Sequence, residues 1–254
     1  MHGLTAREIS EVLDGELHAG PGVPGTGVAI DSRNVKPGDL FIALPGSRVD
    51  GHDFLEAAAD AGASAALVSK AAVLPPSLPG VVVANPLEAL HGLARFHLSR
   101  LSSRIIGITG SVGKTTAKDF LRALLNDHSD PVFASPASWN SEIGLPLSVL
   151  SAPPDTHTLV LEYGINAPGE MERLVATAPP DCAWVTAIGE THLEGLQDLA
   201  GVGREKAFLP GAVPSSGKIW FGPDVDRACC GDWAAPPCDL NPWDAAATQL
   251  MAVE

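Results

Sequence analysis

The feature that most constrains this chain is a glycine-rich segment, GITGSVGKTT, at positions 107–116. A strand is expected before it over residues 104–108, and a helix after it that ends near residue 126. Glycines let the backbone turn its N–H groups toward phosphate oxygens, and the helix dipole adds a positive end. Lys114 can then reach the β- and γ-phosphates, and the Thr115 hydroxyl can ligate Mg²⁺. The pattern predicts a nucleoside triphosphate site formed by Thr109, Gly110, Ser111, Gly113, Lys114, Thr115 and Thr116.

The segment matches a variant of the usual phosphate-loop pattern. The strict pattern has a glycine five positions before Gly113, where this chain has Ile108. The alternative interpretation is a glycine turn that only links a strand to a helix. The order of strand, glycine turn and helix, with Gly-Lys-Thr-Thr at the junction, favours the phosphate site.

The rest of the chain predicts an α/β fold with two domains. Residues 158–163 and 183–188 are apolar strands of the kind buried in a parallel sheet, and residues 217–221 are a further candidate strand. Together with the loop they predict a partial, doubly wound parallel sheet over residues 103–254. Residues 1–102 predict a small α/β unit with strands at 39–44, 64–68 and 81–84. Its helices are expected after Thr5, over 53–61 and after Asn85, where capping residues stand.

Composition excludes two classes of function. The formal net charge of −14 argues against a non-specific nucleic-acid binder, whose affinity depends on Lys and Arg. No window approaches 18 uninterrupted apolar residues, so no membrane span is expected. The four cysteines, Cys182, Cys229, Cys230 and Cys238, show no zinc-ligand spacing and predict reduced, cytoplasmic thiols.

Five motifs in order resemble the Mur ligases, the ATP-dependent amide-forming ligases of bacterial peptidoglycan synthesis. They are DSRNVKPGDLF from position 31 with DGHDF from position 50, GITGSVGKTT, WNSEIGLPL from position 139, LEYG from position 161, and IGETHLEG from position 188. The third and fifth most resemble the members that join D-Ala-D-Ala to UDP-N-acetylmuramoyl-tripeptide. The resemblance covers residues 1 to about 210. It implies a cytoplasmic bacterial enzyme of cell-wall biogenesis, and therefore of cell shape and cell division, that uses ATP and Mg²⁺.

The resemblance also implies roles for individual residues. Thr115, Glu162, His192 and a carbamylated Lys206 would hold Mg²⁺, and Lys114, His192 and Lys206 would be catalytic. Open α/β sheets bind ligands outside the carboxyl ends of their strands, and this independently places Glu162 and His192 near the loop. Ser32 and Arg33 would contact the uridine nucleotide, and Asn140 and Ser141 would lie on the sugar-nucleotide side. The alternatives are a buried paired carboxylate for Glu162, a solvated helix residue for Lys206 and a surface salt bridge for Arg33. Phe208 stands where the family often has an acidic residue.

The chain departs from the family after residue 210. No counterpart of the family's third, ligase domain is expected, the central domain is expected to be incomplete, and residues 211–254 have no assigned role. One interpretation is therefore a ligase represented by a truncated chain. The alternatives are a non-catalytic binding module, one half of a split ligase that a second polypeptide completes, or another P-loop enzyme such as a kinase.

Overall fold

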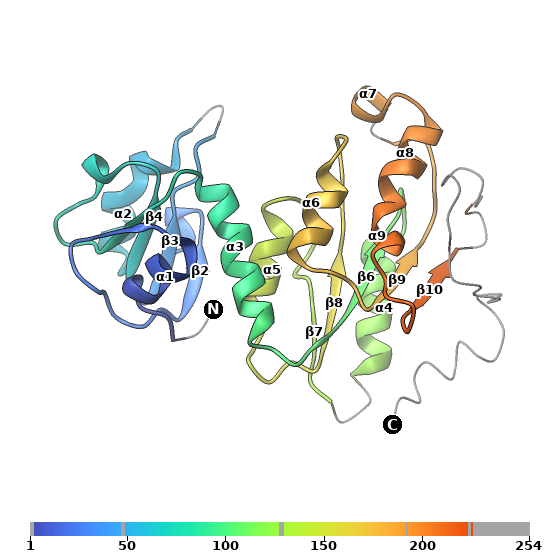
Figure 1. Cartoon of the computed structure of the whole chain (residues 1–254), viewed down its shortest axis with the longest axis horizontal. Coiled ribbons are helices and arrows are strands. Elements are labelled where there is room, and N and C mark those ends of the chain that lie inside the picture. The colour runs from blue at the N-terminus through green and yellow to red at the C-terminus, as the bar shows by residue number, and fades with distance from the viewer. Residues whose placement is uncertain (1–2, 47–48, 127–129, 192, 223–224, 226–254) are drawn as a thin grey trace. The chain divides into compact units, whose positions relative to one another are not determined.

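The computed structural model describes residues 3–46, 49–126, 130–191, 193–222 and 225. The described residues up to 100, with 149–154, form one compact unit, and those of 101–148 and from 155 onward form a second (Figure 1). Residues 149–154 join the first unit, where the ring Nε2 of His97 lies 3.1 Å from the carbonyl oxygen of Ala152. Both units combine helices with largely parallel sheets, so the predicted α/β class is confirmed.

The first unit is built on a five-stranded sheet in the order β1-β5-β4-β3-β2. Its strands are β1 (Glu16–His18), β2 (Gly27–Ala29), β3 (Asp39–Ile42), β4 (Ala65–Val68) and β5 (Gly80–Val82). Strand β1 runs antiparallel to β5, and all other neighbours are parallel. The structure confirms the three predicted strands as β3, β4 and β5, and adds β1 and β2, which the sequence did not predict.

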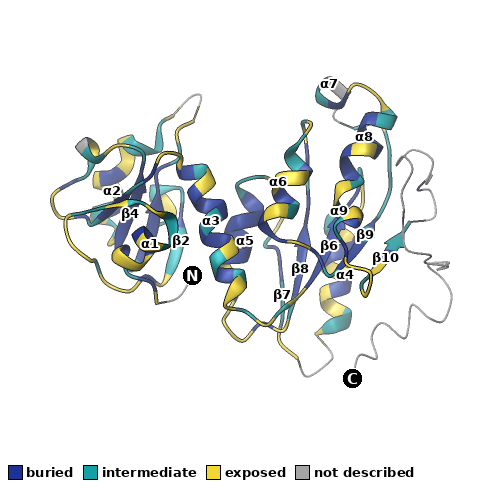
Figure 2. Cartoon of the chain, in the orientation of Figure 1, coloured by how far each residue is buried: buried dark blue, intermediate teal, exposed yellow. Residues whose placement is uncertain are grey.

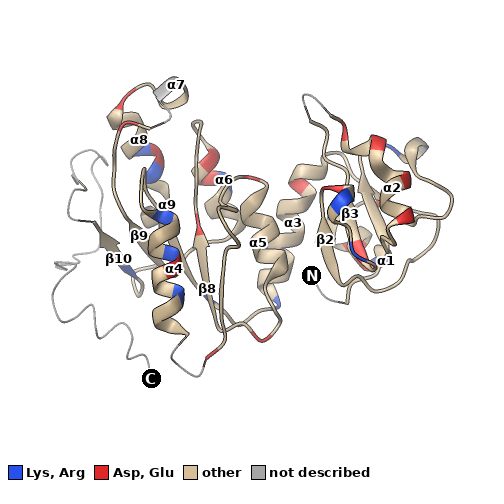
Figure 3. Cartoon of the chain, turned by 180° about the vertical axis from the view of Figure 1, so that it is seen from behind, with Lys and Arg blue, Asp and Glu red and all other residues tan. Residues whose placement is uncertain are grey.

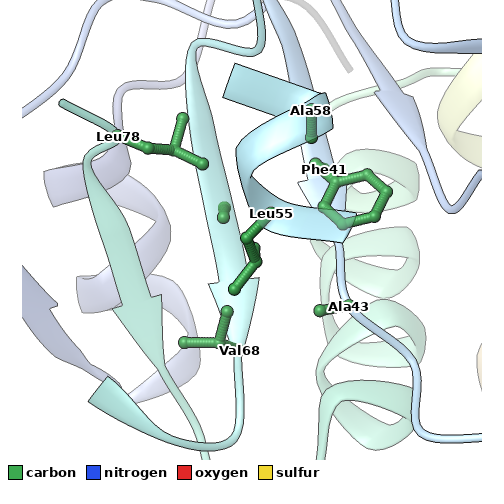
Figure 4. Close-up of a cluster of buried hydrophobic side chains, with 7 residues drawn as sticks. Phe41, Ala43, Leu55, Ala58, Val68 and Leu78 are labelled. Atoms are coloured by element: carbon green, nitrogen blue, oxygen red, sulfur yellow. The ribbon is translucent and has the colours of Figure 1, made fainter. Parts of the chain in front are cut away.

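The described helices of the first unit are α1 (Ala6–Leu13), η1 (Ser32–Asn34), η2 (Gly51–Phe54), α2 (Leu55–Asp60), η3 (Ala71–Val73) and α3 (Pro86–Ser99). Four of them, α1, η1, η2 and α3, begin at a residue whose side chain caps them. Thr5 and Glu8 form the predicted capping box, and Asn85 accepts hydrogen bonds from the first turn of α3. Helix α2 covers the sheet through a buried cluster shown in Figure 4, which contains Phe41, Ala43, Leu55, Ala58, Ala66, Val68 and Leu78.

The second unit contains an all-parallel sheet in the order β10-β9-β6-β8-β7. Its strands are β6 (Arg104–Thr109), β7 (Val132–Ala134), β8 (Thr158–Glu162), β9 (Cys182–Val185) and β10 (Lys218–Phe221). After β6 the chain moves to the edge strand β7 and returns to β8. It then crosses to β9 on the other side of β6. The strand order therefore reverses at β6, which is where ligands bind in doubly wound sheets.

Helices of the second unit connect these strands. They are α4 (Lys114–Leu125), α5 (Gly144–Ser151), of which residues 149–151 belong to the first unit, α6 (Glu170–Thr177), α7 (Leu193–Leu196), α8 (Leu199–Lys206) and α9 (Phe208–Gly211). Helix α4 packs on the sheet through Ala117 and Leu121 against Ile106, Ile108 and Val160, and its opposite face is exposed (Figure 2). Within the described residues, no helix has both the length and the apolar content needed to cross a membrane. Cys182 is a free, buried thiol, and the other three cysteines lie outside the described residues.

Candidate nucleotide and metal site

The glycine-rich loop connects the carboxyl end of β6 to the first turn of α4. Gly110 has φ 150° and Gly113, the N-cap of α4, has φ 81°. A Cβ on Gly110 would lie 2.0 Å from Oγ1 of Thr186 and 3.0 Å from the backbone nitrogen of Ala187. The loop therefore packs directly on the chain that leaves β9, and glycine is required at position 110 both for its φ and for the space.

Lys114 lies within this loop. Its half-buried ammonium donates a hydrogen bond to the carbonyl oxygen of Gly110 at 2.7 Å. Burial lowers the pKa of Lys114, and the negative charge of Glu162 partly opposes that effect. The Lys114 ammonium is thus held against the backbone of the loop, and its contact with the β- and γ-phosphates stays a prediction.

Glu162 ends strand β8 and is 1% exposed. Its Oε2 accepts a hydrogen bond from Oγ1 of Thr115 at 3.0 Å, and its Oε1 accepts one from Nδ2 of Asn140 at 2.7 Å. The structure therefore brings together the predicted metal residues Thr115 and Glu162. It also places Asn140, predicted for the sugar-nucleotide side, on the same carboxylate. The contact of Asn140 with a substrate stays a prediction.

The remaining loop residues differ in their surroundings. Thr109 is fully buried, and its hydroxyl donates to the carbonyl oxygen of Tyr163 at 2.9 Å, so it lies beneath the loop rather than on its exposed surface. Oγ of Ser111 accepts from the Gly189 N–H at 2.9 Å and from Oγ1 of Thr191 at 3.1 Å. Thr116 is exposed on the first turn of α4. Ser111 thereby fixes the segment that leads to position 192.

Two of the predicted site residues follow this segment. His192 lies outside the described residues. Lys206, at the end of α8, is 2% exposed, so the solvated alternative for this residue is wrong. Burial lowers the pKa of Lys206 to about 8; the positive charge of Lys114 also lowers it, and Glu205 opposes this. Figure 3 shows basic residues on both helices involved, α4 and α8.

The oxygens at Thr115 and Glu162 fit a hard divalent cation. Mg²⁺ prefers one or two carboxylates together with hydroxyl, water and phosphate oxygens. The carboxylate of Glu162 is buried, and both of its hydrogen-bond donors, Thr115 and Asn140, are neutral. Among the described residues, no group of three or more His, Cys, Asp or Glu side chains could hold a metal. With the described residues alone, which do not include His192, a cation at Glu162 would therefore take further ligands from the Thr115 hydroxyl, from water or from a bound phosphate.

The predicted uridine-nucleotide residues lie in the first unit on η1. Asp31 caps this turn by accepting from the Arg33 N–H at 3.0 Å. The Arg33 guanidinium also donates to both carboxylate oxygens, with Nη2 at 2.6 Å from Oδ2, and its side chain is 85% exposed. These hydrogen bonds lower the pKa of Asp31 to about 2. The surface-salt-bridge alternative thus describes Arg33 in this structure, and the contacts of Ser32 and Arg33 with a nucleotide stay predictions.

Ser141, the second residue predicted for the sugar-nucleotide side, is exposed. Its Oγ accepts a hydrogen bond from the Gly144 N–H at 3.2 Å, at the start of α5. In this structure the Ser141 side chain therefore satisfies a backbone N–H group at the start of α5.

Sequence reasoning overlooked Lys118, a lysine on α4 that is 1% exposed. Its ammonium donates to the carbonyl oxygens of Ser135 at 2.9 Å and Ala137 at 2.5 Å. The signal was available, because Lys118 stands three residues before the buried Leu121 and therefore on the same face of the helix.

His52 in the first unit joins a carboxylate and a serine. Its Nδ1 lies 2.6 Å from Oδ1 of Asp50, and its Nε2 accepts the Ser69 backbone N–H at 3.0 Å. The group resembles a hydrolytic triad in composition. Nε2 also lies 3.1 Å from Oγ of Ser69, and these contacts connect η2 to the end of β4.

Comparison with known proteins finds two matching family segments. Residues 25–97 match the catalytic domain of the Mur ligase family, and residues 108–224 match the Mur ligase middle domain. The second match spans the loop, Glu162 and Lys206. These matches confirm the resemblance that the motifs indicated.

Two bacterial relatives that match this chain have the same name. The chain is 40% identical over 221 residues to the UDP-N-acetylmuramoyl-tripeptide--D-alanyl-D-alanine ligase of Bacillus subtilis (strain 168). It is 34% identical over 217 residues to that of Escherichia coli (strain K12). Each match covers 85% of this chain but only 48% and 47% of the relative. The chain therefore spans about half the length of these relatives.

Solved structures agree with the sequence comparison. MurF from Acinetobacter baumannii matches with a TM-score of 0.80 at 26% identity, covering 90% of this chain and 51% of that one. The MurF ligase from Thermotoga maritima in complex with ADP matches with a TM-score of 0.69 at 33% identity, covering 77% and 45%.

Proposed function

Because this chain belongs to the Mur ligase family, we propose that its two units serve the ATP-dependent joining of D-Ala-D-Ala to UDP-N-acetylmuramoyl-tripeptide. The observation that carries the proposal is the contact between Thr115 in the phosphate loop and the buried carboxylate of Glu162. A loop that only linked a strand to a helix would not require a buried acid beside its hydroxyl. A site for a metal-bound triphosphate does, because the acid and the hydroxyl can share the cation.

The chemistry is carboxylate activation followed by amide formation. A carboxylate oxygen of the tripeptide attacks the γ-phosphorus of ATP, ADP leaves, and an acyl phosphate forms. The amine of D-Ala-D-Ala then attacks the acyl carbon, loses a proton, and expels inorganic phosphate. The substrates repel one another as anions, so the work of the protein is mainly positioning and charge stabilisation.

The residues around the loop have distinct parts in this proposal. Lys114 and the loop N–H groups bind the β- and γ-phosphates. Thr115 and Glu162 hold Mg²⁺, whose charge offsets that of the triphosphate. His192 and a carbamylated Lys206 complete the catalytic and metal-binding set. The low pKa of Lys206 supports that modification, because only the neutral amine attacks CO₂.

The first unit would bind the uridine nucleotide through Ser32 and Arg33, with Asn140 and Ser141 of the second unit on the sugar-nucleotide side. Arg33 would have to share its guanidinium between Asp31 and the ligand. The side chain is exposed, and its Nε and Nη2 atoms donate to the Asp31 carboxylate. A cytoplasmic location and a completing polypeptide stay predictions from the sequence.

Nucleotide binding by Lys114→Ala tests the proposal. Calorimetric titration of the wild-type chain with ATP and Mg²⁺ should give saturable binding. The variant should lose it while its circular dichroism and melting temperature stay close to wild type, because Lys114 is half-buried at the loop and outside the core. Unchanged affinity in the variant would refute the phosphate-loop assignment.

A turnover assay separates a ligase from a binding module. We expect the 254-residue chain alone to release little phosphate when ATP, UDP-N-acetylmuramoyl-tripeptide and D-Ala-D-Ala are all present. Robust phosphate release that depends on both substrates would contradict this expectation and show that the two units suffice. Binding of ATP without any turnover, even after a completing polypeptide is added, would favour the non-catalytic alternative.

A further inference from the structure

Lys118 is a buried cation that the proposed chemistry does not use. It lies on α4, three residues after Thr115, and is 1% exposed. The ammonium donates to the carbonyl oxygens of Ser135 and Ala137, and it lies 3.4 Å from Oδ1 of the exposed Asp119. Burying an ammonium costs free energy that an apolar side chain of similar size would not cost. The burial of Lys118 is therefore explained by the groups that its contacts position, and not by a gain in stability.

The two carbonyls belong to the segment 135–140, the first part of the connection between β7 and α5. Ala137, at its centre, adopts a left-handed conformation with φ 45°. Such a conformation costs a non-glycine residue free energy and persists only where its surroundings impose it. The ammonium on the Ala137 carbonyl is a contact of that kind, so Lys118 fixes the middle of the segment.

Both ends of the segment return to Glu162. Oγ of Ser135 accepts the Glu162 backbone N–H at 3.2 Å, and Nδ2 of Asn140 donates to the Glu162 carboxylate at 2.7 Å. The Asn140 carbonyl oxygen also accepts the Gly164 N–H at 2.8 Å. The position of the amide of Asn140, and with it one oxygen of Glu162, thus depends on a segment that Lys118 holds.

We infer that Lys118 is a positioning residue for the cation site: through the 135–140 segment it aligns Asn140 and the Glu162 carboxylate with Thr115. Thr115 and Lys118 lie on neighbouring positions of the same helical face. Helix α4, which carries the Thr115 hydroxyl, therefore also anchors the 135–140 segment, and that segment orients the Glu162 carboxylate. This inference rests on the proposed function, because that function is what places a divalent cation at Glu162.

The test is Lys118→Met in the full chain, read by nucleotide binding at varied Mg²⁺ concentration. The Mg²⁺ concentration for half-maximal nucleotide binding should rise by about tenfold or more, the usual effect of removing a group that orients a ligand. Nucleotide affinity without Mg²⁺ should stay within about twofold of wild type, because the loop N–H groups and Lys114 are unchanged. Hydrogen exchange in the metal-free protein should become faster over residues 135–140.

Leu121→Ala is the matched control. Leu121 lies one turn further along α4, is 9% exposed, and packs in the apolar cluster beneath the helix. Its truncation should lower the melting temperature without changing the Mg²⁺ dependence or the exchange over 135–140. An unchanged Mg²⁺ dependence in Lys118→Met, or an equal change in Leu121→Ala, would overturn the inference. Absence of nucleotide binding by the wild-type chain would overturn the proposed function instead, and the exchange data would still test the hold of Lys118 on the segment.

If Lys118→Met does not fold, Lys118→Gln replaces it. The amide of Gln keeps two N–H donors but ends one bond short of the lysine nitrogen and carries no charge. It cannot hold both carbonyls in the same way, so a rise in the required Mg²⁺ of about threefold or more is expected. Wild-type Mg²⁺ dependence in this variant would equally refute the positioning role.

Discussion

Gly110→Ala is the perturbation whose effect the structure defines most fully. The new Cβ would lie 2.0 Å from Oγ1 of Thr186, where ordinary contact is 3.4–4 Å. The threonine side chain would have to move by more than an ångström. Its hydroxyl now lies 2.6 Å from the Val112 carbonyl oxygen and 3.2 Å from that of Thr109, so the movement breaks contacts on both sides of the loop. The φ of 150° adds backbone strain for any residue with a Cβ.

The expected cost follows from these two contributions. Backbone strain costs about 2 kcal/mol, and displacing the Thr186 hydroxyl costs about 2 kcal/mol more, so Gly110→Ala should lower the free energy of unfolding of the second unit by about 4 kcal/mol. In a Thr186→Ala background the hydroxyl is already absent. There the same substitution should cost only about 2 kcal/mol.

Urea unfolding of the four proteins in this double-mutant cycle measures the difference. Gly169→Ala is the control for backbone strain alone, since Gly169 has φ 82° and a Cβ there would meet nothing within 4 Å. It should cost only about 1 kcal/mol. Equal costs of Gly110→Ala in the two backgrounds would refute the steric reasoning, because the interaction with Thr186 would then contribute nothing.

Two further predictions concern stability. Burial lowers the pKa of Lys206 to about 8, below its value in the unfolded chain, so the folded state releases this proton first as the pH rises. The wild-type free energy of unfolding should therefore increase relative to Lys206→Met between pH 8 and about 10 in CO₂-free buffer; parallel urea-unfolding curves across that range would contradict it. Thr5→Ala removes the N-cap of α1 and should cost the first unit about 1 kcal/mol by thermal unfolding. Adding Glu8→Ala should cost little more, since both residues serve one capping box, and full additivity would contradict the shared role.

The sequence predicted the helices and strands that are determined by residues close together in the chain. The helices after Thr5 and Asn85 begin where their capping residues stand, because a side-chain oxygen satisfies the first N–H groups of the helix. Strands β6 and β8 are confirmed within one residue of the predicted ranges, since a continuous apolar run is buried on both faces of a parallel sheet.

Three short strands could not be predicted in this way, although β5, which also has three residues, was expected. Strands β1, β2 and β7 each have three residues, and their sequences, ELH, GVA and VFA, are too short for a pattern that marks a strand. Each exists because a neighbour pairs with it, as Leu17 pairs with Val81 across β1 and β5. That partner comes from a distant part of the chain.

The candidate site was predicted where strand ends determine it. Glu162 was expected near the loop because ligands bind outside the carboxyl ends of the strands in open α/β sheets, and the structure places its strand, β8, beside β6. Lys118 was not expected, since a lysine in a helix is usually solvated. Its burial depends on the 135–140 segment folding back over α4.

Among the described residues, the three most deeply buried Asp, Glu, Lys or Arg side chains lie on elements around the loop. Glu162, Lys118 and Lys206 are each at most 2% exposed, although apolar residues would be buried at lower cost. In contrast, the Arg33 side chain of the Arg33–Asp31 pair is 85% exposed, and such pairs contribute little to stability. A protein under selection for stability alone would lose the buried charges first. Their presence at the end of β8, on α4 and on α8 therefore points to a role in the polar geometry around the phosphate loop, at the expense of stability.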